Sequence, residues 1–321
     1  MLSQPVTTKD IHEGTYQNKA GAFKFVHAAM QGWREKMEDA FEIYSPSGQN
    51  SQFMAFGVYD GHGGDNVAIK ASKYCIKDIC EEKGFKEAAN WEGEGSKDED
   101  YMKIIQGACE EGMLNCDKRI RDLNRIDGED CDESGCTACV NIITEDFISC
   151  ANLGDTRAVL CRNGEVLEMS HDHKPTNPDE TKRIEKAGAR VTRKRVNAAI
   201  AVSRSLGDYF FKSNEDENGK QKHPWDQPLT CKPEVITRRR QVETDEFVVC
   251  CCDGIWDVMS NQEVLDFVRG KLQEGESTLS MISGELINKC LAEGSKDNMS
   301  VVILLFPAGE KLIPKSCCSV M

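Results

Sequence analysis

The chain has 321 residues, of which 39% are hydrophobic and 29% are charged, a composition typical of a globular protein with a sizeable core. Its 54 acidic side chains outnumber the 40 basic ones, and the net charge of −14 argues against a nucleic-acid or anionic-membrane binder, since both surfaces repel an acidic protein. No apolar run reaches the roughly 20 residues of a membrane span and the start lacks the pattern of a secretion signal, so we expect a cytoplasmic protein, with a nuclear location also allowed.

The chain divides into three predicted parts. Residues 1–21 are polar without a regular hydrophobic pattern, which predicts an N-terminal arm. From residue 22 to residue 307 apolar segments recur without a Pro-rich or Ser-rich linker, which predicts one domain. Residues 308–321 are polar and form a predicted C-terminal tail. We expect the protein to be a monomer.

Short, nearly continuous apolar runs predict β-strands that are covered on both faces. An Asn163-Gly164 turn predicts a hairpin between two of these strands. The predicted strands cover residues 53–59, 147–153, 157–161, 166–167, 247–252 and 301–306.

Helical periodicity is clearest from Tyr101 to Leu123, where apolar residues recur on one face. Ser260 and Glu263 form a predicted capping box that begins another helix, and further helices are expected after residue 65 and over residues 279–292. The strands are close-paired and do not alternate regularly with helices. This order favours an α+β fold with a two-sheet sandwich flanked by helices over a doubly wound parallel sheet.

Three polar segments are predicted to be loops, and two of them contain acidic stretches that resemble calcium-binding loops. The predicted loops are residues 90–100, 124–135 and 213–227. The calcium-like stretches begin at residues 130 and 214, but their twelfth positions hold Asn141 and Trp225 where an acid is required. Solvated acidic loops are therefore favoured over a calcium-binding regulator.

Cys136 and Cys139 have the spacing of a redox or zinc motif. No second Cys or His pair stands at a matching distance, so we interpret them as two small residues of the core. All 16 cysteines are expected to be reduced thiols in the cytosol.

Acidic residues recur at the ends of predicted strands. Asp60 and Asp253 follow strands and precede glycines, Asp155 follows Gly154, and Asp297 comes just before the last strand. If these ends converge, the like charges repel one another unless cations lie among them. An all-oxygen ligand set indicates magnesium or manganese rather than zinc, and a two-metal site that activates a water for phosphoester hydrolysis is the simplest inference.

Two further side chains suit phosphoester hydrolysis. Arg34 is a candidate phosphate ligand because its planar guanidinium matches a phosphate bidentately, and the alternative is a surface ion pair with Glu35 or Glu38. His62 is a candidate general acid because it titrates near neutral pH beside a proposed metal ligand. The alternatives for His62 are a plain metal ligand or a turn residue.

Seven segments, in order along the chain, together resemble the metal-dependent Ser/Thr protein phosphatases of type 2C. They read GWREKMEDA, VYDGHGG, SGCTA, NLGDTRAVL, VSRSLGDYFFK, CDGIWDVM and GSKDNMSVVIL. The resemblance spans roughly residues 21 to 306, which makes the predicted domain 22–307 a catalytic domain. It implies a central β-sandwich of two mainly antiparallel sheets with paired helices outside each, in four α-β-β-α layers, and hydrolysis of phosphoserine and phosphothreonine in phosphoprotein substrates.

The resemblance also implies a centre of two Mg²⁺ or Mn²⁺ ions. Asp60 would bridge both ions, and the carbonyl of Gly61 would bind one of them. Asp253 and Asp297 would complete the ligand set.

Further roles follow from the same resemblance. Glu38 would act on the metals through water, Asp39 would orient His62 or bound water, and Arg34 would hold the phosphate.

Two more acids match less firmly defined positions of the family. Asp155 corresponds to an acid tied to a weaker third ion, and Asp208 is a further candidate ligand of that ion. Arg195 and the segment 188–202 resemble the family's flap beside the cleft, where substrate choice is expected to be set.

The sequence departs from the family pattern in ways that affect the expected activity and anchoring. Leu2 stands where N-myristoylation requires glycine, so that acyl anchor is not expected, and neither is the additional C-terminal helical domain of some family members. The last four residues, starting at Cys318, fit a prenylation box, and Cys317 beside it suits palmitoylation, so a reversible membrane association is a hypothesis. Two alternatives to a protein phosphatase remain. They are a pseudophosphatase that binds phosphoproteins without turnover and a small-molecule phosphomonoesterase.

Overall fold

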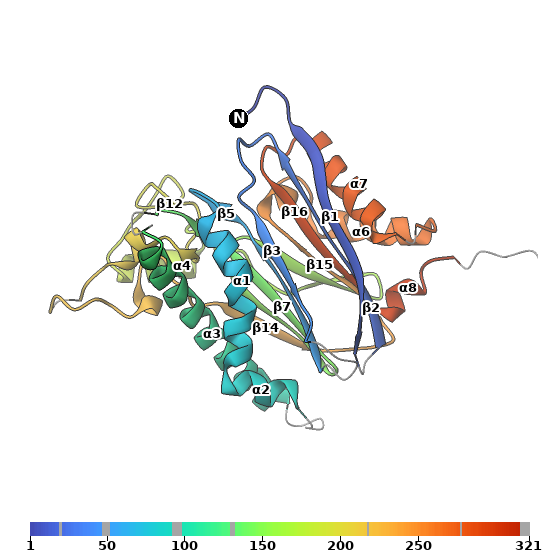
Figure 1. The fold of residues 1–321 in the computed structure, drawn as a ribbon, viewed down its shortest axis with the longest axis horizontal. Helices are drawn as coiled ribbons and strands as arrows, with labels where there is room; N and C mark the ends of the chain where they lie inside the picture. Colours follow the sequence, from blue (N-terminus) through green and yellow to red (C-terminus); the bar gives the residue numbers. More distant parts are fainter. Residues whose placement is uncertain are drawn as a thin grey trace, which may run out of the picture.

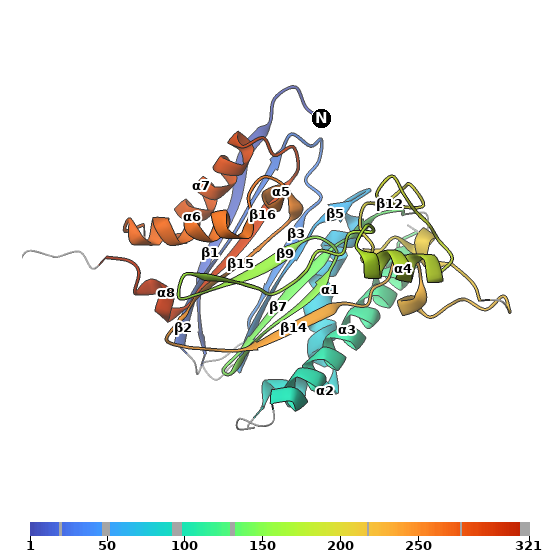
Figure 2. The same ribbon diagram turned by 180° about the vertical axis from the view of Figure 1, so that it is seen from behind.

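A computed structural model describes the protein over residues 1–18, 21–46, 52–91, 98–128, 132–216, 218–276 and 278–314. Two antiparallel sheets lie face to face and helices cover both outer faces, so the layers follow the order α-β-β-α (Figures 1 and 2). The α+β sandwich expected from the sequence is therefore confirmed.

The first sheet has six strands, and in it the first two strands of the chain lie beside the last one. Its strand order is β1 (Val6–Asn18), β2 (Gly21–Gly32), β16 (Met299–Leu305), β15 (Asp245–Cys251), β9 (Arg157–Arg162) and β10 (Glu165–Glu168). Every neighbouring pair is antiparallel. The hairpin between β9 and β10 turns at Asn163 and Gly164, which both have positive φ as the predicted turn requires.

The second sheet has five strands, again all antiparallel. Its order is β14 (Glu234–Arg239), β8 (Phe147–Leu153), β7 (Ala138–Thr144), β4 (Phe53–Tyr59) and β3 (Ala40–Tyr44). A small three-stranded sheet of β13 (Leu206–Gly207), β6 (Gly135–Cys136) and β5 (Gly61–His62) continues from the end of this sheet toward the cavity described below.

Alternation along the strands builds three apolar layers. In β4, Phe53 and Tyr59 face the helices, whereas Phe56 and Val58 face the other sheet. Because both faces are covered, all seven residues of β4 are buried. This explains why the strand is a continuous apolar run in the sequence.

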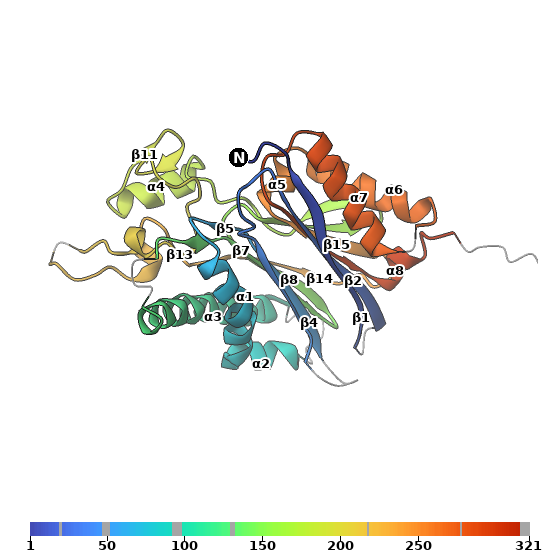
Figure 3. The same cartoon turned by 45° about the horizontal axis from the view of Figure 1, so that its top comes forward.

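Helices cover the two outer faces of the sandwich. The five-stranded sheet is covered by α1 (Asn66–Glu81), α2 (Lys83–Ala89) and α3 (Asp98–Ile126) (Figure 3). The six-stranded sheet is covered by α6 (Asn261–Gln273) and α7 (Leu279–Ala292). The short helix α8 (Pro307–Glu310) lies near the first residues of β15, at the end of that strand away from the cavity. The helix α6 begins with the predicted capping box of Ser260 and Glu263. None of the helices in the described ranges combines the length and apolar character that a membrane span needs.

A segment between β10 and β14 lies beside one end of the sandwich. It contains α4 (Pro178–Lys186), the two-stranded sheet of β11 (Val191–Thr192) and β12 (Arg195–Val196), and the short 3₁₀ helices η2 (Tyr209–Lys212) and η3 (Pro224–Asp226). A separate small apolar cluster, which includes Ile184 and Val196, packs this segment together. Figures 1 and 2 show it next to β5, at the end of the sandwich where the predicted site residues lie.

The prediction that residues 1–21 form an arm is wrong for their local structure. Residues Val6–Asn18 form β1, which pairs along its length with β2. Most of the side chains that the structure describes in β1 are exposed, and among them only Tyr16 is buried, so the strand is held through its backbone and carries no alternating apolar pattern. Hydrophobic periodicity therefore gave no signal for this strand.

Other differences concern missed strands and loop limits. The strands β2, β3, β7 and β14 were not predicted. Two predicted loops are shorter than expected, because α3 begins at Asp98 and extends to Ile126. The two calcium-like stretches lie partly outside the described residues, and Cys317 and Cys318 lie wholly outside them.

Candidate active site

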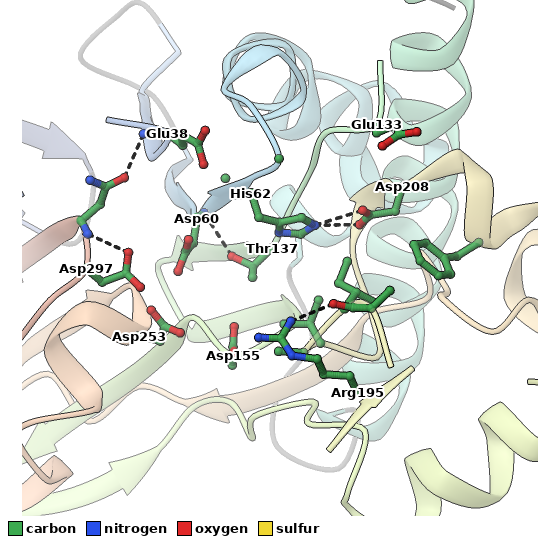
Figure 4. A pocket seen from close by; sticks show the side chains of 18 of the residues that line it. Glu38, Asp60, His62, Glu133, Thr137, Asp155, Arg195, Asp208, Asp253 and Asp297 are labelled. Carbon is green, nitrogen blue, oxygen red and sulfur yellow. Dashed lines mark hydrogen bonds and ion pairs between the residues drawn. The ribbon is translucent and has the colours of Figure 1, made fainter. Parts of the chain in front are cut away.

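Four of the predicted metal ligands come together at one end of the sandwich. Asp60 follows β4, Asp155 lies just after β8, Asp253 follows β15, and Asp297 lies two residues before β16. Because β15 and β16 are antiparallel neighbours, with Cys251 opposite Val301, the end of one strand and the start of the other meet. Figure 4 shows the four carboxylates converging from these strand ends.

The carboxylates line a cavity of about 610 Å³. Its wall includes most of the predicted site residues. They are Arg34, Glu38, Asp60, Gly61, His62, Asp155, Arg195, Asp208, Asp253 and Asp297. Asp39 is the exception: its carboxylate oxygens are buried close to Asp60, and it is not part of the cavity wall.

Asp60 is the centre of the acidic cluster. Carboxylate oxygens of Asp60, Asp155 and Asp253 lie within 4.8 Å of one another. Burial and the neighbouring carboxylates raise the pKa of Asp60 well above its ordinary value, and they raise the pKa of Asp253 to about 8. Without a cation the protein therefore favours protonated carboxyl groups here, as expected for acids packed against one another.

Asp39 supports the same cluster from inside the protein. One of its oxygens lies within 4.8 Å of ligand atoms of Asp60 and Cys252. Within the described chain, both Asp39 oxygens are buried without a well-formed hydrogen bond, and burial raises the pKa of this carboxyl to about 6. Buried carboxylate oxygens are normally satisfied, so this pair of unsatisfied oxygens fits a group that is missing from the structure, such as a cation or its water.

Glycine at position 61 allows the backbone of Glu38 to lie close to the end of β4 beside the acidic cluster. A Cβ on Gly61 would collide with the carbonyl oxygen of Glu38. The backbone N–H of Asp60 donates to Oγ1 of Thr137 at 3.1 Å, which fixes the end of β4. The carbonyl of Gly61 is thus held at the wall of the cavity, beside the carboxylates.

Arg34 forms an ion pair with Asp297 across the cavity rim. The alternative pairing of Arg34 with Glu35 or Glu38 is not observed among the described residues. Burial opposes the charge of Arg34, but Asp297 more than compensates and raises the pKa of the guanidinium. Half of the Arg34 side chain, 53%, remains exposed, so it is accessible to an anion entering the cavity.

His62 pairs with Asp208. Its Nε2 lies 2.9 Å from Oδ2 and 3.1 Å from Oδ1 of that carboxylate (Figure 4). Oγ of Ser205 donates to the same Oδ2 at 2.6 Å. Burial alone would lower the pKa of His62, but Asp208 outweighs burial and raises it. A Cβ on Gly135 would overlap both Asp208 and His62, so the pair depends on glycine there.

This pairing bears on the expected roles of two acids. Asp39 was expected to orient His62 or bound water; it lies beside Asp60, and the carboxylate that contacts His62 is Asp208, so orienting bound water is the role that stays a prediction for Asp39. Asp208, a candidate ligand of a third ion, contacts His62 and Ser205. Asp155, the other candidate for that ion, forms an ion pair with Lys174.

Several site residues were not singled out in the sequence. Thr137 anchors Asp60, and Lys174 balances the charge of Asp155. Asn298 accepts from the N–H of Glu38 at 2.9 Å and donates to the carbonyls of Gln31 and Lys36, which ties the segment carrying Arg34 to β16. Thr137 and Asn298 lie within quoted motifs, but nothing in the sequence assigned them partners. Glu133, which also lines the cavity, had no signal beyond its place in an acidic stretch.

Comparisons with known proteins agree with this geometry. The family model described as protein phosphatase 2C matches residues 23–299. Human protein phosphatase 1A is 38% identical over 302 residues, covering 94% of this chain and 75% of that protein, and mouse protein phosphatase 1B is 37% identical over 313 residues, covering 97% and 76%.

Solved structures support the fold. The structure titled serine-threonine phosphatase 2C from Toxoplasma gondii aligns with a TM-score of 0.74 at 18% identity, covering 92% of this chain and 99% of that one. A phosphatase from a pathogenic strain of the same organism aligns with a TM-score of 0.73 at 22% identity, covering 93% and 96%. With the family model and the close relatives in agreement, the chain belongs to the protein phosphatase 2C family of metal-dependent protein serine/threonine phosphatases.

Proposed function

We propose that the protein hydrolyses phosphoserine and phosphothreonine residues of other proteins in this cavity, with the help of two Mg²⁺ or Mn²⁺ ions. The observation that carries the proposal is the convergence of Asp60, Asp155 and Asp253 within 4.8 Å, next to Arg34 and the His62–Asp208 pair. An all-oxygen donor set with unsatisfied buried oxygens on Asp39 suits hard divalent cations.

The carboxylates would hold the cations, and the other residues would handle the substrate. Asp60 and Asp253 are the principal ligands proposed, with the Gly61 carbonyl and Asp297 beside them, and Glu38 acting through water. When bound, the cations supply a hydroxide nucleophile at neutral pH by lowering the pKa of coordinated water. Asp155 is the candidate ligand for a weaker third ion.

Arg34 and His62 act directly on the phosphorylated side chain in this proposal. The Arg34 guanidinium donates to the phosphoryl oxygens, a geometry for which its planar fork is suited. His62 donates a proton to the oxygen of the departing serine or threonine, because an alkoxide is a poor leaving group. Asp208 is a positioning residue that holds the imidazole and stabilises its protonated form.

The experiment measures phosphate release from a phosphothreonine peptide in EDTA and after Mg²⁺ or Mn²⁺ is restored. We expect no turnover in chelator and recovery with either cation. Asp60→Asn should abolish turnover and remove metal binding in isothermal titration calorimetry, whereas Asp122→Asn, an exposed acid on α3, serves as the matched control. In EDTA the Asp60 variant should unfold no earlier than the wild type, since it loses a carboxyl group whose charged form is disfavoured by burial and by the neighbouring carboxylates.

Full turnover in excess chelator, or normal activity of the Asp60 variant, would overturn the proposal. Metal binding without turnover on any peptide would favour the pseudophosphatase alternative. A higher kcat/KM for small phosphate esters than for every phosphopeptide would favour the small-molecule alternative. The monomeric state remains a prediction, as does lipidation at Cys318 and Cys317, which mass spectrometry of the carboxyl terminus from native cells tests.

A further inference from the structure

The short helix η2 is fixed on three of its four residues. The hydroxyl of Tyr209 donates to the carbonyl of Asp117 at 2.8 Å. The ammonium of Lys212 is buried, and it donates to Oδ1 of Asp117 at 2.8 Å and to the carbonyl of Ser205 at 2.9 Å. Phe211 packs on the small apolar cluster of the neighbouring segment. The turn is therefore a rigid platform attached to α3.

Phe210, the remaining residue of η2, projects from this platform. Its side chain is 78% exposed, yet it lines the same cavity as the acidic cluster. It follows two residues after Asp208, the partner of His62. A rigid backbone and an aromatic side chain with only two rotatable bonds lose little conformational entropy when they bind a partner, as is typical of aromatic contact residues at interfaces.

Apolar residues next to Phe210 extend this feature into one wall of the cavity. The wall consists of Ala199, Ile200, Ala201, Val202, Phe210 and Phe211. Ile200 and Phe211 lean on the apolar cluster of the neighbouring segment, and Val202 is buried at 6% exposure. The rest of the cavity is formed mainly by carboxylates, Arg34 and His62. The cavity thus has a polar side suited to a phosphate and an apolar side suited to a hydrocarbon group.

We propose that Phe210 determines substrate specificity by binding a bulky apolar side chain close in sequence to the phosphorylated residue. This inference rests on the proposed phosphatase function. The occupant is the substrate chain itself, because the apolar wall and the proposed phosphate site belong to one continuous cavity. A chain that places its phosphate near Arg34 and His62 enters the cavity that this wall lines, and burying an apolar side chain against Phe210 is favourable.

The test uses matched phosphothreonine peptides that carry either Leu or Ser at one position, moved from three residues before to three residues after the phosphothreonine. For the wild type with Mg²⁺, kcat/KM should favour Leu at one or more positions by about tenfold, the size expected for burying one such side chain. Phe210→Ala should lose that preference, and Phe210→Leu should restore most of it. Hydrolysis of the matched Ser peptides, which lack a bulky apolar side chain at the tested position, should change little in either variant.

Met281→Ala is the matched control, because Met281 is 52% exposed and lies on α7, on the far side of the sandwich from the five-stranded sheet and its helices. It should retain the Leu preference of the wild type. A wild type without any preference, or a preference that survives in Phe210→Ala, would overturn the inference. If the metal-loaded wild type does not hydrolyse p-nitrophenyl phosphate at all, this result would instead count against the proposed function itself.

Discussion

His62 and Asp208 are 146 residues apart in the chain, and Nε2 of the imidazole lies 2.9 Å from Oδ2 of the carboxylate. Asp208 has a positive φ of 53° at the start of η2, and Ser205 donates to the same oxygen at 2.6 Å. The pair is thus built on a turn that fixes the carboxylate. An imidazole held this way stays oriented and is more readily protonated than a free one.

Asp208→Asn is expected to slow the hydrolysis of alkyl phosphate esters by about tenfold, because the neutral amide no longer stabilises the protonated imidazole. Aryl esters, whose leaving groups need no proton, should be affected much less. Steady-state kinetics on phosphoserine peptide and p-nitrophenyl phosphate measure this difference. Equal losses on both substrates would show that Asp208 has a purely structural or metal-binding role.

His62→Gln removes the proposed proton donor itself. We expect a loss of about 10²-fold or more for an alkyl ester and a much smaller loss for an aryl ester. The double variant with Asp208→Asn should be hardly slower than His62→Gln alone, since Asp208 acts through the imidazole. Additive losses in the double variant would mean that the two residues work independently.

The sequence was informative where side-chain pattern and structure coincide. The strand at 53–59 was predicted with its observed limits because both faces are buried, which leaves a continuous apolar run. The strand β1 was missed because its backbone pairs with β2 while most of its side chains stay in solvent. A pattern of apolar residues reports burial, and it is silent about strands that are held mainly by hydrogen bonds.

The residues of the site were likewise predicted where they lie next to a recognisable sequence pattern and missed where they do not. Asp60 and Asp253 were identifiable because each follows an apolar strand and precedes a glycine, and Arg34 and His62 were candidates from their own chemistry before the family resemblance supported them. The contact between His62 and Asp208 was not predicted, because Asp39 was expected to orient His62 or bound water. That contact joins a two-residue strand to a left-handed turn, and neither element has a periodic pattern that places it in space.

Arg34→Ala is expected to weaken phosphate binding and raise KM by about tenfold, with a smaller change in kcat. Because Arg34 also pairs with Asp297, the measurement requires saturating metal so that altered cation affinity does not imitate the effect. Arg34→Lys keeps the charge without the planar fork and should recover only part of the loss. An unchanged KM in Arg34→Ala would remove the phosphate-binding role.

His27 provides a prediction that is independent of the metal site. It is buried in β2 at 2% exposure, where it stacks on Phe41, and its Nδ1 has no hydrogen-bond partner in the described chain. Burial, assisted by the nearby His12, lowers the pKa of His27 to about 3. His12 itself forms an ion pair with Asp10.

The folded protein therefore keeps His27 neutral, while the unfolded chain protonates it below an ordinary pKa of about 6.5. Stability from this group is fully present above that pH and is lost as the pH falls toward 3, at about 1.4 kcal/mol per pH unit. Between pH 7.5 and pH 5.0, protonation of His27 in the unfolded chain should lower the free energy of unfolding of the wild type by about 2 kcal/mol. His27→Phe should not show this loss, because phenylalanine keeps the stacking and cannot titrate. Urea unfolding at both pH values in EDTA measures the difference, with His223→Gln, an exposed histidine, as the control that should follow the wild type. If wild type and His27→Phe lose the same stability between the two pH values, His27 is not the buried neutral group that the structure indicates.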